Sequence, residues 1–70
     1  MIYVGFKVDR TDCVHLIVTP DYEKCVGKLL NDMKTKGDDY WYWIEGWQNE
    51  RCVKEFVYSP EKAQFAPYPD

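Results

Sequence analysis

Residues 38–47 read Asp-Asp-Tyr-Trp-Tyr-Trp-Ile-Glu-Gly-Trp and contain all three tryptophans of the chain. From residue 40 onward the stretch has the composition of a β-strand, and its aromatic residues fall on both alternating faces of that strand. Because a strand points successive side chains to opposite sides of its sheet, only one set of rings covers the core. The other set predicts a large aromatic surface on the second side of the sheet.

The two faces of this strand differ in their polar content. One face combines tyrosines with an aliphatic residue and a glycine, and the other combines tryptophans with a carboxylate: Tyr40, Tyr42, Ile44 and Gly46 against Trp41, Trp43, Glu45 and Trp47. Ile44 favours the core and Glu45 favours water, so we expect the tryptophans to face outward. A bulge near Gly46 would shift the end of the register and with it the position of Trp47.

Two strands are predicted near the start of the chain. Residues 2–8 alternate between apolar side chains and a second face made of Tyr3, Gly5 and Lys7, which is typical of a half-buried strand. A polar turn over residues 9–12 leads into a strand over residues 13–18, and the two strands form a hairpin. We expect the outward side of the sheet to gather these neighbours around the tryptophans: Tyr3, Lys7, His15, Ile17, Val53 and Val57.

A change of period then marks an α-helix. Thr19 supplies a capping hydroxyl, Pro20 suits the first helical position, and Asp21 places negative charge at the positive end of the helix. Apolar residues follow at spacings of 3, 1, 3, 1 and 3: Tyr22, Cys25, Val26, Leu29, Leu30 and Met33. This stripe predicts an amphipathic helix that runs to about Lys36 and ends at Gly37.

The rest of the chain is predicted to form a turn over residues 48–51, a fourth strand over residues 52–58, a short helical turn and an extended tail. Pro67 and Pro69 prevent a longer helix near the end. The order ββαββ predicts an α+β fold, in which one helix packs on a four-stranded, mainly antiparallel sheet. We expect a single domain over residues 1–70, with a body of residues 1–58 and a turn and tail of residues 59–70.

Composition limits the class of function. The chain has 70 residues, a hydrophobic fraction of 46% and a net charge of −3, which fits one small globular domain. It lacks the positive field that a general nucleic-acid binder needs. Because the sequence has neither a leader-like segment nor an apolar stretch of membrane-spanning length, we expect a cytosolic protein without membrane association. Three cysteines, an odd number, argue against a closed disulfide framework.

Cysteine and histidine side chains are the first candidates for metal binding or catalysis. Cys13, His15, Cys25 and Cys52 supply the ligand count of a zinc site, but no Cys-x-x-Cys pair is present. Cys25 belongs to the core stripe of the helix, whereas Cys13 and His15 share a strand face that offers no predicted pocket or oxyanion donor. We therefore predict no metal, no cofactor and no enzymatic activity.

Two short motifs carry a resemblance. The opening Met-Ile-Tyr-Val and the junction Phe-Val-Tyr-Ser-Pro-Glu-Lys-Ala at residues 56–63 are similar to small uncharacterised single-domain proteins of phages and mobile elements. In such proteins Ser-Pro-Glu-Lys-Ala opens a helix, which Pro67 and Pro69 would cut short here. The resemblance implies a protein that docks on a host or defence protein and blocks it. It assigns no role to any single residue.

The function that the sequence favours is binding of another protein, without catalysis. The predicted binding residues lie on or beside the outward aromatic face: Trp41, Trp43, Glu45, Trp47, Tyr3, Lys7 and His15. Two other uses of the same rings stay open, namely stacking on single-stranded RNA and packing of two copies into a dimer. The tail also has rings, those of Phe65 and Tyr68, with which to cover the face.

Overall fold

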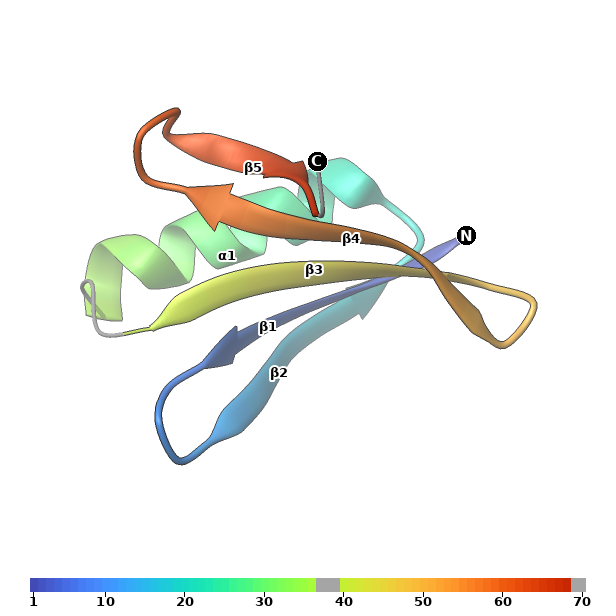
Figure 1. Cartoon of the computed structure of the whole chain (residues 1–70), viewed down its shortest axis with the longest axis horizontal. Coiled ribbons are helices and arrows are strands. Elements are labelled where there is room, and N and C mark those ends of the chain that lie inside the picture. Colours follow the sequence, from blue (N-terminus) through green and yellow to red (C-terminus); the bar gives the residue numbers. More distant parts are fainter. Residues whose placement is uncertain (37–39, 69–70) are drawn as a thin grey trace.

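The computed structural model describes residues 1–36 and 40–68, which form one helix packed on one antiparallel sheet (Figure 1). The elements in chain order are β1 (Ile2–Val8), β2 (Cys13–Thr19), α1 (Tyr22–Lys36), β3 (Trp41–Gln48), β4 (Arg51–Ser59) and β5 (Gln64–Pro67). The strands lie in the order β2-β1-β3-β4-β5, and α1 covers one face of the sheet. The predicted α+β class is confirmed, with five strands in place of four.

Helix α1 begins at Tyr22, two residues later than its proline suggests. The Asp21 carboxylate accepts hydrogen bonds from the backbone N–H groups of Glu23 and Lys24, at 3.0 and 3.3 Å. Asp21 is therefore the capping residue, and the Thr19 hydroxyl supports it by accepting the Asp21 N–H at 3.1 Å. Gly37 and the acidic pair at residues 38–39 lie outside the described residues.

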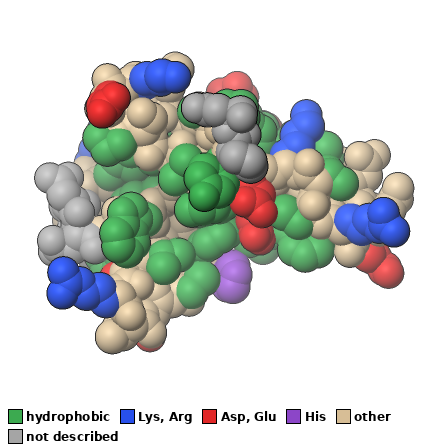
Figure 2. Space-filling view, viewed as in Figure 1, with side chains coloured by type: hydrophobic (Ala, Val, Ile, Leu, Met, Phe, Trp, Pro, Cys, Tyr) green, Lys and Arg blue, Asp and Glu red, His purple; other side chains and the backbone are tan. Residues whose placement is uncertain are grey.

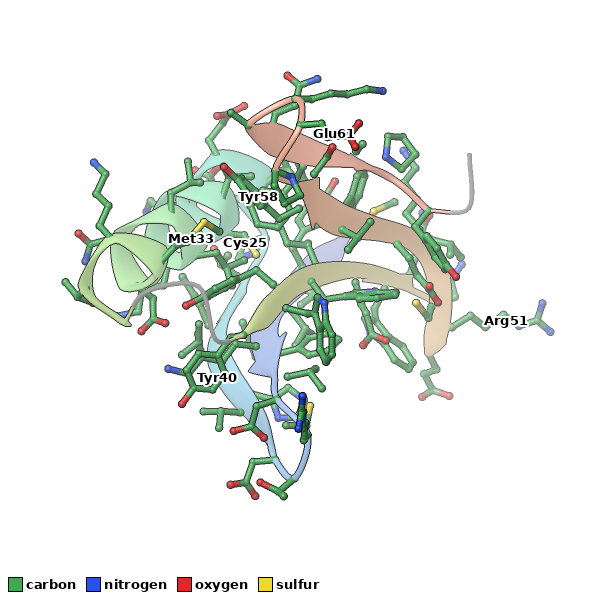
Figure 3. The ribbon with its side chains drawn as sticks, turned by 60° about the vertical axis from the view of Figure 1, so that its left-hand side comes forward. Cys25, Met33, Tyr40, Arg51, Tyr58 and Glu61 are labelled. Atoms are coloured by element: carbon green, nitrogen blue, oxygen red, sulfur yellow. The ribbon has the colours of Figure 1, made fainter. Side chains whose placement is uncertain are left out.

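The core lies between α1 and the centre of the sheet. Cys25 and Leu29 of α1 are fully buried against Ile44 and Tyr42 of β3. Figure 3 shows Cys25 in the layer between the helix and the strands, with Tyr58 of β4 on the same side of the sheet. Ile44 and Tyr42 alternate with the tryptophans, so the predicted division of β3 into a core face and an outward face is confirmed.

Strand β1 has the reverse orientation to the one predicted. Its helix side consists of Tyr3, Gly5 and Lys7: the Tyr3 ring packs against Tyr22 of α1 at 5.2 Å, and the Lys7 Nζ lies 3.2 Å from an Asp32 oxygen. Gly5 explains the reversal, because it leaves room for the helix at the point of closest approach. A Cβ there would lie only 2.7 Å from the Leu29 Cδ1.

The C-terminal segment is a strand and not a tail. A tight turn with φ values of 53° at Asn49 and 64° at Glu50 leads into β4, which runs to Ser59. Residues 60–63 form a further turn without a helix, and β5 then pairs with β4, so that the rings of Tyr58 and Phe65 lie 5.5 Å apart. Pro67 is accommodated because β5 is an edge strand.

Candidate functional site

The side of the sheet that faces away from α1 is called here the open face. Figure 2 looks onto this side and shows hydrophobic side chains gathered across the strands, around a small acidic group, with basic side chains at the periphery. The register places on it the apolar residues of β1 and the tryptophans of β3, with contributions from the other strands. The main apolar members are Ile2, Val4, Phe6, Val8, Val18, Trp41, Trp43, Trp47, Val57, Ala66 and Tyr68.

The tryptophans occupy the open face as predicted. Trp41 is the most accessible, with 63% of its surface exposed, and Trp47 is 37% exposed. Trp43 is half-buried because the Tyr68 ring packs edge-on against it, with the ring centres 5.1 Å apart. Tyr68 covers part of Trp43, but it is itself 51% exposed and so adds its own ring to the aromatic surface. Phe65, the other ring expected to cover the face, lies on the helix side against Tyr58.

Five of the six expected neighbours of the tryptophans divide into two groups, and the sixth, Val53, is 48% exposed and has no facing residue on β3. His15 lies on the open face with its ring 5.7 Å from Phe6, and Val57 lies opposite Trp43. The placement of Tyr3, Lys7 and Ile17 on this face is wrong. All three point to the helix side, because the face of β1 that contains Gly5 packs under α1 and Ile17 pairs with that glycine.

A pair of carboxylates that the sequence did not predict lies in the middle of the open face. Glu45 of β3 stands directly opposite Glu55 of β4, and the Cys52 thiol lies beside them. One ligand-type atom from each of the three side chains lies within 4.8 Å of the others. The indole N–H of Trp47 donates a hydrogen bond to Glu45 at 3.2 Å.

A bulge in the β3–β4 hairpin creates this pair. The ladder starts next to the turn, with Gln48 opposite Arg51 and Trp47 opposite Cys52. If this register continued without a shift, Glu45 would lie opposite Lys54. The register instead shifts between Gly46 and Trp47, so Lys54 pairs with Gly46 on the helix side and Glu55 comes opposite Glu45. The only signal for the pair in the sequence was the expected bulge near Gly46.

The charged strand residues of the open face in the described chain are acidic. Burial of the Cys52 thiol raises its pKa, and the negative charges of Glu45 and Glu55 raise it further. In the described part of the chain, no strand position on the open face carries lysine or arginine. Lys7 forms its ion pair on the helix side, and Arg51 projects away from the end of the hairpin (Figure 3).

The four residues considered for a zinc site do not converge. Cys25 is buried on the helix side, where loss of solvent raises the pKa of its thiol to about 11. Cys13 and Cys52 lie at opposite ends of the open face, since the first is in line with Trp41 and the second pairs with Trp47. Trp41 and Trp47 are six residues apart along β3, so the two cysteines lie about 20 Å apart in the direction of the strands.

Comparisons of the chain with protein-family models, with curated proteins and with solved structures give no match. Within residues 1–36 and 40–68, no helix is long and apolar enough to cross a membrane.

Proposed function

We propose that this protein is a non-catalytic binding protein that docks on another protein through its open face. The observation that carries the proposal is the continuous aromatic and aliphatic surface around Trp41, Trp43 and Trp47. Large exposed apolar patches on small proteins commonly mark interaction sites, and tryptophan and tyrosine are the side chains that most often anchor interfaces. Trp41, with 63% of its surface exposed, is the leading anchor.

The proposed consequence of docking is inhibition of the partner. The motifs at residues 1–4 and 56–63 resemble small phage proteins, and such proteins act by covering a surface of a host or defence protein. A cytosolic partner fits this role. Single-stranded RNA is a weaker candidate, because the exposed lysines Lys24, Lys28 and Lys34 lie on α1 and are remote from the rings that would stack on bases.

The test is a pull-down from lysate of the native cell, analysed by mass spectrometry and for nucleic acid. We expect one protein to be captured by the wild type and lost in Trp41→Ala and in the Trp41→Ala/Trp43→Ala double variant. Trp41→Ala is the cleaner probe, because Trp43 also packs on Tyr68 and contributes to stability. Val14→Ala is a matched control, since Val14 is an apolar side chain with 42% exposure that pairs with Lys7 on the helix side.

Three results contradict the proposal. If both tryptophan variants still capture the protein, the binding site does not lie on the open face. Nucleic acid that is released steeply by salt favours RNA binding. A dimer that dissociates in Trp41→Ala favours self-association through the same rings.

A further inference from the structure

We propose that the open face receives an arginine side chain of its protein partner, seated on the Glu45–Glu55 pair. This inference rests on the proposed function and adds the chemistry of the group that the partner must present. It is carried by the position of the two carboxylates, by the repulsion between them in the free protein, and by the rings that surround them.

The two carboxylates lie at the centre of the face. They stand opposite each other on neighbouring strands, with Trp43 and Val57 as the next facing pair and Trp47 and Cys52 on the other side. The hydrogen bond from the Trp47 indole fixes the Glu45 carboxylate. On the β4 side, the backbone N–H of Tyr68 donates to the backbone carbonyl of Glu55 at 2.9 Å, and the Tyr68 ring packs against Trp43, the neighbour of Glu45 on the open face.

The pair is unfavourable without a cation. Like charges directly opposite each other on a sheet destabilise the strand pairing, whereas the regular ladder would have set Lys54 against Glu45. The observed register moves Lys54 to the helix side and leaves two carboxylates together in an apolar surround. A cation supplied by a partner removes this repulsion.

Arginine fits the site better than the other cations. Its planar guanidinium has five N–H donors, enough for two carboxylates at once, and it stacks favourably on aromatic rings. Two copies packed through their open faces would not supply the group, because no strand position on that face carries arginine or lysine in the described residues. A metal ion is a poorer match, since the three side chains that gather here are one short of the four ligands of a structural zinc site, and the pKa of the Cys52 thiol is raised and so disfavours the thiolate that a metal binds.

The experiment is a selection of random short peptides displayed on phage against the immobilised wild-type protein. We expect the enriched peptides to contain an arginine flanked by apolar residues. Their affinity for the Glu45→Gln/Glu55→Gln variant should fall by a factor on the order of ten or more. Exchange of the arginine for citrulline, which keeps its shape and removes its charge, should cause a similar loss.

Two controls test whether the loss of peptide affinity comes from the two carboxylates themselves. Glu50→Gln/Glu61→Gln makes the same change of net charge at two exposed turn positions and should bind the peptides as the wild type does. Glu45→Gln/Glu55→Gln should melt no lower than the wild type, because it removes a repulsion, and light scattering should show it to be a monomer.

The outcomes separate this inference from the proposed function. Peptides that need Trp41 but bind Glu45→Gln/Glu55→Gln unchanged overturn the arginine site and leave the docking face in place. Peptides that depend on neither Trp41 nor the carboxylates overturn both.

Discussion

Two buried acids, the thiol of Cys25 and the phenol of Tyr42, link the stability of the fold to pH. Loss of solvent raises the pKa of Cys25 from 9.0 to about 11. Loss of solvent also raises the pKa of Tyr42, and the Asp32 carboxylate that accepts its hydrogen bond at 2.7 Å raises it further. Both groups therefore hold their protons more tightly in the folded chain than in the unfolded chain.

The sign of the pH dependence follows from these directions. Each group contributes stability that is fully present below its pKa in the unfolded chain and is lost as the pH rises toward its pKa in the folded chain. We expect the urea midpoint to be constant near neutrality and to fall between pH 9 and pH 11, the range set by Cys25. Tyr42→Phe should make the fall shallower. A midpoint that stays level over this range would show that neither group is buried as described.

Single residues also show where the sequence alone was insufficient. The alternation of residues 2–8 predicts Lys7 on the open face, because Lys7 lies on the strand face opposite the apolar side chains. In the structure it is 8% exposed, paired with Asp32, and 4.4 Å from the centre of the Tyr40 ring. Asp32 lies 25 positions away in the chain, so the group that neutralises Lys7 was not visible in the local pattern.

At the scale of elements, the contact of α1 with β1 sets a stability prediction for two glycines. A Cβ at Gly5 would lie 2.7 Å from Leu29 and 2.9 Å from the Cys25 sulfur, whereas a Cβ at Gly27 on the outer side of α1 meets nothing within 4 Å. Gly5→Ala should destabilise the fold by about 1–3 kcal/mol through overpacking. Gly27→Ala should stabilise it by about 1 kcal/mol, because alanine favours the helix.

Thermal melting followed by circular dichroism tests the pair of variants. For a domain of this size, about 1 kcal/mol corresponds to a Tm shift of roughly 4–8 °C. Equal shifts in the two variants would mean that α1 does not pack closely over Gly5.

Elements with a strong internal pattern were predictable, and those that depend on a distant partner were not. The stripe from Tyr22 to Met33 predicted α1 through Lys36, because its period belongs to the segment itself. The period-2 pattern of β1 predicted a strand but not which side meets the helix, since both sides carry apolar or aromatic residues. The segment that forms β5 was predicted as an extended tail because Pro67 and Pro69 prevent a long helix, and its pairing with β4 depends on an edge position.

At the scale of the whole molecule, charge is distributed unevenly over its two sides. The open face carries Glu45 and Glu55 without a basic strand residue in the described chain, so two open faces brought together would set four carboxylates near one another. We expect a monomer, and light scattering should give a mass near 8.4 kDa at neutral pH. A stable dimer under the same conditions would contradict this expectation.

The candidate site was predictable in its aromatic part and not in its acidic part. Ile44 and Glu45 orient β3, so the outward position of the tryptophans followed from one strand. The Glu45–Glu55 pair depends on a single extra residue in β4, and the sequence does not show on which strand a bulge falls.

The order of strands in the sheet has a consequence for how the chain folds. In the described chain, β1–β3 is the one ladder between strands that are not successive in sequence, and it joins the hairpin of residues 2–19 to the meander of residues 41–67. Hairpins form in about 1–10 μs, whereas a long-range ladder waits on loop closure, so we expect β1–β3 pairing to limit the folding rate. The open face draws its aliphatic residues from β1 and its tryptophans from β3. A chain that is still emerging from the ribosome therefore has no complete open face until this last ladder closes.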